Sequence, residues 1–173
     1  GNSAGNRVST GIFNTLIGAL AGDALTDADY NVAVGYGALT DDTLGSRTVA
    51  IGLNALQNQN LTTATTTYNV AIGSSVGESI TTGTHNTLIG GESGDLLTVG
   101  NANVAVGFRT LSGDTKGDRN VAIGYEALLN QNFTTSTDSL NTVIGYQAGH
   151  DVTTGFYNTL VGGVCGDQLT DAD

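Results

Sequence analysis

The pentapeptide NVAVG stands at residues 31–35 and again at residues 103–107, and close variants of it recur along the whole chain. Nine copies begin at positions 14, 31, 48, 69, 86, 103, 120, 141 and 158. Most steps between them are 17, but the third and the seventh are 21, so the pattern of steps recurs as a longer 72-residue unit of four coils. Self-similarity at a fixed period is typical of a solenoid. We therefore interpret residues 1–173 as a single repeat array of about ten coils.

Within the pentapeptide, counted from position 0, β-branched residues alternate with other aliphatic residues. Position 1 is Val or Thr, and position 3 is Val or Ile, in every copy. β-Branched residues at a period of two favour a strand over a helix. Position 2 lies on the opposite face of that strand and is always Ala, Leu or Val. A strand that is apolar on both faces is normally covered on both. We expect one face to line the solenoid, and the position 2 side chains, such as Ala105, to contact another copy of the chain.

The two ends of the pentapeptide are also nearly invariant. Position 4 is always Gly, which predicts a positive φ or a close approach of two backbones. These glycines are Gly18, Gly35, Gly52, Gly73, Gly90, Gly107, Gly124, Gly145 and Gly162. Position 0 is Thr48 in one copy and Asn in the others, and stacked Asn side chains can form a ladder of hydrogen bonds. The predicted ladder consists of Asn14, Asn31, Asn69, Asn86, Asn103, Asn120, Asn141 and Asn158. A row of ligand-binding amides is the alternative interpretation.

Beyond position 4, the coils are of two kinds. Some continue with a second Gly and then an aliphatic residue, as at Gly22 and Leu25, whereas others continue with a Leu, as at Leu39. Both patterns predict a second short strand in each coil. Two coils of the second kind carry four extra residues, and their polar stretches at 57–69 and 129–141 predict loops that protrude from the rod. Because the chain begins and ends within a coil, we interpret it as a window of a longer fibre.

The composition disfavours several classes of partner. The chain has 16 Asp and Glu residues against 5 Lys and Arg, which gives a net charge of −11. A surface of this sign repels phosphate backbones and anionic lipids, so we expect no nucleic-acid partner. No run of residues approaches the about 18 consecutive apolar residues of a membrane-spanning helix, so we expect no membrane insertion. The single Cys165 excludes an intrachain disulfide, and its slot, filled elsewhere by Ala, predicts a buried thiol.

Residues suited to catalysis are few and scattered, so we expect no enzyme, no cofactor and no metal. The two histidines, His85 and His150, lie far apart in sequence and have no metal-ligand spacing. Three aspartates recur only once in every four coils, at Asp23, Asp95 and Asp167. A weak calcium site in the acidic run DADYN at 27–31 is the alternative.

Eight of the ten aromatic side chains flank the pentapeptide. Four precede it and four follow its Gly: Phe13, Tyr30, Tyr68 and Tyr157, then Tyr36, Phe108, Tyr125 and Tyr146. We expect these rings to stack on the turns between coils. The alternative is a glycan-binding module whose aromatic rows contact sugar rings. Ice binding is a third hypothesis, disfavoured because the Thr-x-Thr patterns lie mainly in the two long loops and not once per coil.

The variants NVAIG at 69–73 and NVAVG at 103–107, separated by turns of small residues, resemble the head repeats of YadA-like trimeric adhesins. They are also similar to repeats of phage tail-fibre proteins. The resemblance extends over all nine copies. It implies a homotrimer of left-handed parallel β-rolls and a role in surface attachment, and it identifies no ligand-binding residue.

The sequence therefore predicts a non-enzymatic fibre segment of the cell surface, extracellular space or virion, which associates with itself, with surface glycans as a further candidate partner. The only N-x-[ST] sequons begin at Asn60 and Asn132, one in each predicted loop and at equivalent places of the four-coil unit. Their placement on exposed segments makes both asparagines candidate glycosylation sites.

Overall fold

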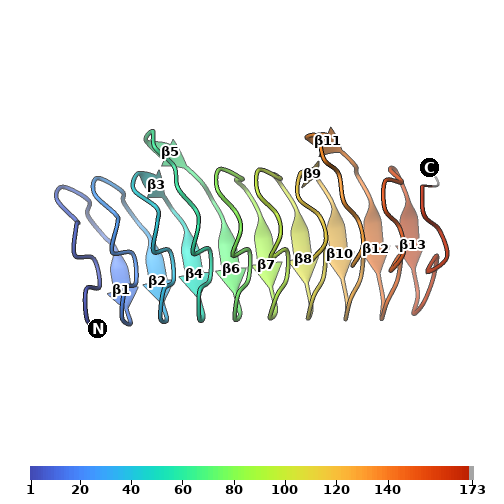
Figure 1. Ribbon diagram of the computed structural model, residues 1–173, viewed down its shortest axis with the longest axis horizontal. Helices are drawn as coiled ribbons and strands as arrows, with labels where there is room; N and C mark the ends of the chain where they lie inside the picture. The colour runs from blue at the N-terminus through green and yellow to red at the C-terminus, as the bar shows by residue number, and fades with distance from the viewer. Residues whose placement is uncertain (172–173) are drawn as a thin grey trace.

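The computed structural model describes residues 1–171, which wind into a straight stack of coils with strands and no helix (Figure 1). One parallel sheet of nine strands runs the length of the rod, and its neighbours are successive copies of the pentapeptide. Its strands are β1 (Thr15–Ile17), β2 (Val32–Val34), β4 (Val49–Ile51), β6 (Val70–Ile72), β7 (Thr87–Ile89), β8 (Val104–Val106), β10 (Val121–Ile123), β12 (Thr142–Ile144) and β13 (Thr159–Val161). The prediction of an all-β parallel solenoid is confirmed.

The register of this sheet joins equal positions of the repeat. Thr15 pairs with Val32, the same position in the next coil. Val49 pairs with Val70 across a coil that carries the insertion, so the longer coil does not shift the register. A one-residue slip would move every side chain to the other face, and the apolar interior fixes this register.

The interior contains the position 2 side chains, and this corrects the sequence-based assignment of the two faces. Ala105 is completely buried within its own chain, so it cannot contact a second copy. The side chains of positions 1 and 3 point outward instead, and in the end strands Ile17 and Val161 are 58% and 65% exposed. The turns of each coil place further apolar side chains against the position 2 side chains and so enclose them.

Positions 8 and 11 complete the interior and explain the two kinds of coil. One kind has Gly at position 8 and an aliphatic residue at position 11, as in Gly22 and Leu25. A Cβ on Gly22 would lie 2.8 Å from Leu25 Cδ1, so the large side chain at position 11 requires the small residue at position 8. The other kind has Leu at position 8 and a polar residue at position 11, as in Leu39 and Asp42. Both arrangements fill the coil.

The segment after the position 4 Gly does not form the predicted second strand in each coil. It consists of turns, in which Leu39 and Leu56 have positive φ of 55° and 50°. A left-handed residue bends the chain and cannot continue a strand. The backbones of these turns still bond from coil to coil, as where Leu39 N–H donates to Ala55 O at 2.9 Å.

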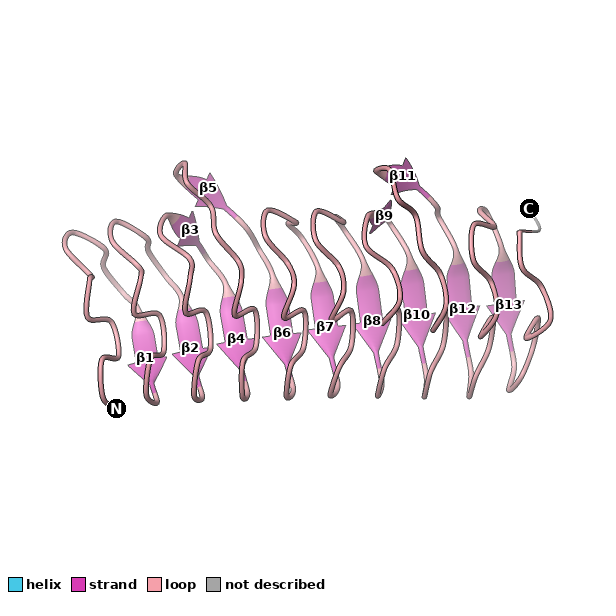
Figure 2. Cartoon of the chain, viewed as in Figure 1, coloured by secondary structure: helices cyan, strands magenta, loops and turns pink. Residues whose placement is uncertain are grey.

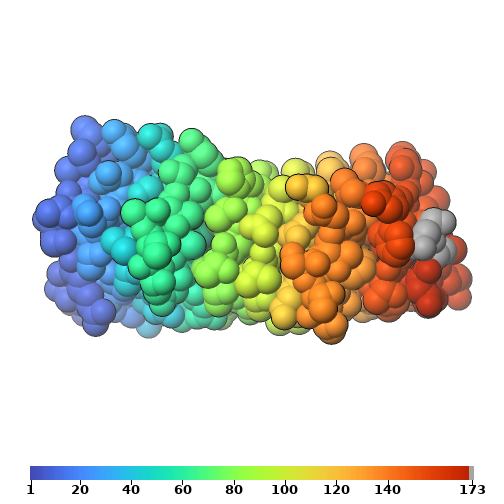
Figure 3. Space-filling model, turned by 90° about the horizontal axis from the view of Figure 1, so that it is seen from above, coloured from blue at the N-terminus to red at the C-terminus, as the bar shows by residue number. Residues whose placement is uncertain are grey.

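The two long loops protrude on the same side of the rod (Figure 2). Each carries a short strand that pairs with the preceding coil, so that β5 (Thr65–Thr66) joins β3 (Gly45–Ser46) and β11 (Thr137–Asp138) joins β9 (Gly117–Asp118). Seen from above, the molecule is one continuous rod from its first coil to its last (Figure 3). The insertions therefore add a local ledge and leave the stack intact.

The position 4 glycines combine both features that the sequence suggested. Gly35 has a φ of 139°, which an L side chain rarely adopts. A Cβ at Gly35 would also lie 2.2 Å from the carbonyl oxygen of Gly52 in the next coil. Only glycine allows two coils to approach this closely at the turn.

Candidate functional site

The Asn residues at position 0 bond mainly to backbone and are closed to ligands. The side-chain oxygen of Asn31 accepts the Thr48 N–H at 2.9 Å, and its Nδ2 donates to Gly45 O at 2.9 Å. The same pair of bonds recurs at Asn86. Direct amide-to-amide bonds occur as well, at 3.2 Å between Asn103 and Asn86. The six central members, from Asn31 to Asn141, are buried, so this ladder holds coils together and offers no row of binding amides.

A buried polar pair that joins the first long-loop coil to the coil before it was not anticipated from the sequence. Asp42 and Gln59 both occupy position 11, in consecutive coils, and both are fully buried. Gln59 Nε2 donates to Asp42 Oδ2 at 2.7 Å. Asp42 Oδ1 accepts the Gly45 N–H at 3.2 Å and the Leu61 N–H at 3.0 Å. These bonds attach the base of the long loop to the interior of the rod.

The second long loop has the same attachment one four-coil unit later. Gln131 Nε2 donates to Asp114 Oδ2 at 2.7 Å, and the Phe133 N–H donates to Asp114 Oδ1 at 3.1 Å. Gln131 Oε1 in turn accepts Asn141 Nδ2 at 2.8 Å, which connects the pair to the Asn ladder. The sequence signal was present, because a polar residue replaces the aliphatic one at position 11 only in the coils around these insertions.

Burial raises the pKa of the Asp42 and Asp114 carboxyls above the ordinary value, although their hydrogen bonds oppose this shift. All of the donors that face Asp42 and Asp114 are neutral amide groups. A carboxylate held only by neutral donors in an apolar interior keeps part of its desolvation cost. Both groups are closed to solvent and suit a structural role, not general acid–base catalysis.

Five of the eight aromatic rings that flank the pentapeptide stack on a ring of the neighbouring coil. The rings of Phe108 and Tyr125 lie 5.7 Å apart with an interplanar angle of 25°, and those of Tyr125 and Tyr146 lie 5.4 Å apart with an angle of 12°. Phe13 stacks on Tyr30 in the same way at 5.1 Å. A sugar ring would need a free ring face, so this geometry does not favour glycan binding within these stacks.

The structure reveals one row of hydroxyl groups with nearly one member per coil, which the sequence reasoning missed. It occupies position 12 and consists of Thr26, Thr43, Thr81, Thr98, Thr115, Thr153 and Thr170, with Asn60 and Asn132 in the long-loop coils. Thr98 Oγ1, for example, donates to Thr115 O at 2.9 Å. The neighbouring position 13 varies from Asp27 to Leu44, so the hydroxyls form a single line. A line whose hydrogens are already used within the rod does not favour ice binding.

The remaining candidate residues stay apart in space or make ordinary contacts. His85 lies against the Tyr68 ring at 5.5 Å, in the aromatic row. Cys165 is only partly buried, contrary to the prediction, because it belongs to the last coil and no further coil covers it. In the DADYN run, Asp27 and Asp29 each accept a hydrogen bond from the preceding coil, from Thr10 Oγ1 and the Ile12 N–H.

Within residues 1–171, no three His, Cys, Asp or Glu side chains form a group that could hold a metal ion. A helix that could cross a membrane is also absent from this part of the chain. The aspartates Asp23, Asp95 and Asp167 lie in separate coils. The described residues therefore form a repeated scaffold, along which these candidate side chains are spread over several coils.

Among known proteins, no family, no curated protein and no solved structure matches the chain.

Proposed function

We propose that this chain is a structural segment of an extracellular fibre, on a cell surface or a virion, which spaces or presents an adhesive tip. In this proposal the coils form a left-handed β-roll, and three copies associate side by side. The observation that supports it best is the uninterrupted in-register stack from β1 to β13. Each coil contacts mainly its two neighbours, so such a rod can be lengthened without redesign.

Self-association is supported by the outward face of the nine-stranded sheet. This sheet face consists of the position 1 and position 3 side chains, which are all Val, Ile or Thr and include no charge. Ile72, Ile89 and Ile144 are each 37% exposed on it. An apolar stripe that repeats once per coil along the whole rod needs a partner with the same period. Another copy of this chain has that period, and the resemblance to YadA-like repeats supports three copies.

The oligomeric state tests this proposal. Size-exclusion chromatography with light scattering should give three times the 17.5 kDa chain mass. The double variant Ile72→Asp with Ile89→Asp should be monomeric, because it buries unpaired carboxylates at the interface. Leu53→Asp is the matched control, since Leu53 is 50% exposed outside the sheet and should leave the trimer unchanged. A monomeric wild-type chain would contradict the self-association.

Glycosylation of Asn60 and Asn132 is part of the same proposal. Both side chains are exposed, whereas the next residues, Leu61 and Phe133, are buried and fix the sequon on the rod. In a source that glycosylates secreted proteins, intact mass spectrometry should show two modifications, and Asn60→Gln should remove one of them. Unmodified protein from such a source would contradict this part alone.

A further inference from the structure

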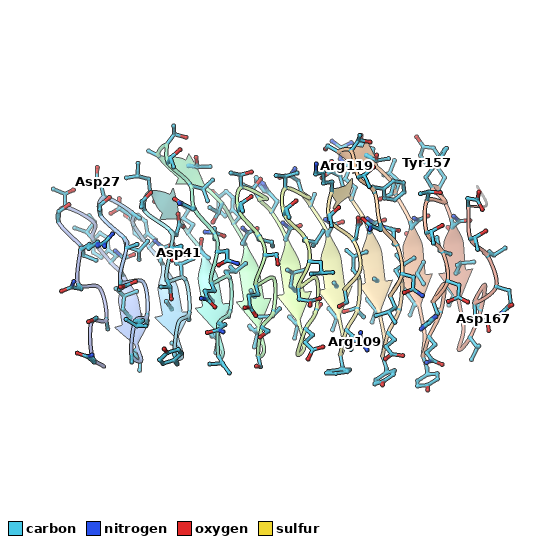
Figure 4. All side chains as sticks on the ribbon, in the orientation of Figure 1. Asp27, Asp41, Arg109, Arg119, Tyr157 and Asp167 are labelled. Atoms are coloured by element: carbon cyan, nitrogen blue, oxygen red, sulfur yellow. The ribbon has the colours of Figure 1, made fainter. Side chains whose placement is uncertain are left out.

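A small pocket opens on the turn side of three consecutive coils, away from the outward sheet face. Its volume is about 190 Å³, and its walls include Glu92, Asp95, Leu96, Arg109, Ser112 and Asn130. Arg109 lies at the edge of the rod opposite Arg119 and Tyr157 (Figure 4). The pocket walls include no side chain of the outward sheet face, so the pocket is clear of the surface that would join copies, and Asn130 places it beside the base of the second long loop.

Arg109 brings an unsatisfied donor to this pocket. Its Nε lies 3.5 Å from Glu92 Oε2, and its Nη1 lies 3.5 Å from Glu126 Oε1. These are ion-pair distances but are long for hydrogen bonds. Arg109 Nε is buried and is the one such side-chain nitrogen or oxygen within residues 1–171 that has no hydrogen bond. The Arg109 side chain as a whole is 41% exposed, so its outer N–H groups, and not the buried Nε, are open to an acceptor in the pocket.

The opposite walls supply acceptors and an apolar surface. The Asp95 carboxylate accepts a hydrogen bond from the Ser112 hydroxyl, and burial raises its pKa. Asn130 Nδ2 donates to Asp151 Oδ1 at 3.1 Å, which orients the amide. Leu96 is 48% exposed and offers a hydrocarbon patch. The walls of the pocket thus combine hydrogen-bond donors, acceptors and an apolar side chain.

The four-coil repeat shows that this chemistry is an addition to the scaffold. The charged row of Glu92, Arg109 and Glu126 is replaced, one unit earlier, by Leu20, Gly37 and Asn54. The pocket residues Asp95 and Asn130, in contrast, keep their identity there as Asp and Asn. The stack folds with either set, so the charged row is not needed for the coil. Glu92 and Arg109 line the pocket, and Glu126 pairs with Arg109 beside it.

We propose that this pocket binds one neutral sugar ring of a glycan. A sugar hydroxyl both donates and accepts, which matches an arginine donor facing carboxylate acceptors. The volume is below the few hundred Å³ typical of drug-sized ligands, so it accommodates a single ring. The net charge of −11 and the two carboxyl groups in the walls disfavour an anionic ligand, and the ion pair of Arg109 with Glu92 offsets one of these two carboxyl groups. This inference does not depend on the fibre function, because the pocket lies outside the sheet face.

Heteronuclear NMR of the whole chain, titrated with methyl glycosides of neutral hexoses, deoxyhexoses and N-acetylhexosamines, tests the proposal. At least one glycoside should shift the amide signals of Ser112, Gly113 and Asn130. Arg109→Gln and Asp95→Asn should each weaken binding about tenfold or more, since each removes a charged partner of a hydroxyl group. Asp23→Asn, at the equivalent position of the first unit, is the matched control and should bind normally.

Three outcomes would overturn the proposal. The first is that no glycoside in the panel shifts these amides. The second is that Arg109→Gln binds as tightly as wild type while its circular dichroism and melting temperature are unchanged. The third is that a sialic acid glycoside or arginine methyl ester, used as anionic and cationic probes, binds there in preference to every neutral sugar. Loss of the oligomer would not affect any of these results.

Discussion

The two kinds of coil fill their interior with different side chains at positions 8 and 11. Coils such as the one with Gly22 and Leu25 have an interior of hydrocarbon side chains and carry no long loop. In coils such as the one with Leu39 and Asp42, the large apolar residue is at position 8 instead, and position 11 holds a buried carboxylate. The second kind occurs where the long loops leave the rod. The polar interior therefore attaches the insertion, since the Asp42 carboxylate accepts the Leu61 N–H and the Gln59 side-chain amide of the loop base.

The largest effect is expected from Asp42→Leu, which imposes the apolar interior on a coil that still has Leu39. Three buried donors would lose their acceptor, and the new side chain would overlap Leu39. Each lost bond costs about 1–3 kcal/mol, and overpacking adds about 1–3 kcal/mol. We expect a loss of about 4 kcal/mol or more in urea unfolding followed by circular dichroism. Asp41→Leu, at the exposed neighbouring residue, is the control and should change little.

A second substitution should recover part of that loss. Leu39→Gly, combined with Asp42→Leu, recreates the pairing seen at Gly22 and Leu25 and removes the overlap. Leu39 has a positive φ, so glycine suits its backbone. A double-mutant cycle should give a favourable coupling of about 1–2 kcal/mol. Strictly additive effects would show that positions 8 and 11 do not share one space.

A smaller effect is expected from pH. Because the folded pKa of Asp42 and Asp114 is raised, the folded chain binds these protons more tightly than the unfolded chain. Their contribution to stability is therefore fully present below the unfolded pKa near 3.8 and is lost as pH rises through the folded pKa. Melting temperatures near neutral pH and in mild acid should show a larger gain on acidification for wild type than for Asp42→Asn with Asp114→Asn. Equal gains would contradict the role of these two groups.

The smallest effect concerns the turns that both kinds of coil share. Ala102 is exposed and has a φ of 57°, a conformation that costs an L residue about 1–2 kcal/mol. Ala102→Gly removes that cost but raises the entropy of the unfolded chain, so we expect a net gain of about 0.5 kcal/mol. Ala19→Gly, where φ is not positive, should destabilise the chain instead. A loss of stability in Ala102→Gly would show that these turns are not strained.

Much of the fold follows from the repeat alone. The alternation of Val, Ile and Thr required strands, and the regular step between copies required parallel neighbours in register. The invariant Gly indicated a close backbone approach, which the contact between Gly35 and Gly52 realises. These features are local or periodic, so they can be inferred from spacing and residue type.

Which face of the strand is inside depends on the tertiary structure. Positions 1, 2 and 3 are nearly all apolar, so the two faces of the strand differ little in polarity. Which face becomes the interior depends on where the turns place the side chains of positions 8 and 11. The same is true of the bonds of Asp42 to the loop base and of the single Thr row at position 12. Residues that lie far apart in one coil, or in equal places of successive coils, meet only after the turns have set the course of the chain. Those turns involve residues such as Leu39 and Arg109, whose side chains do not normally indicate a positive φ.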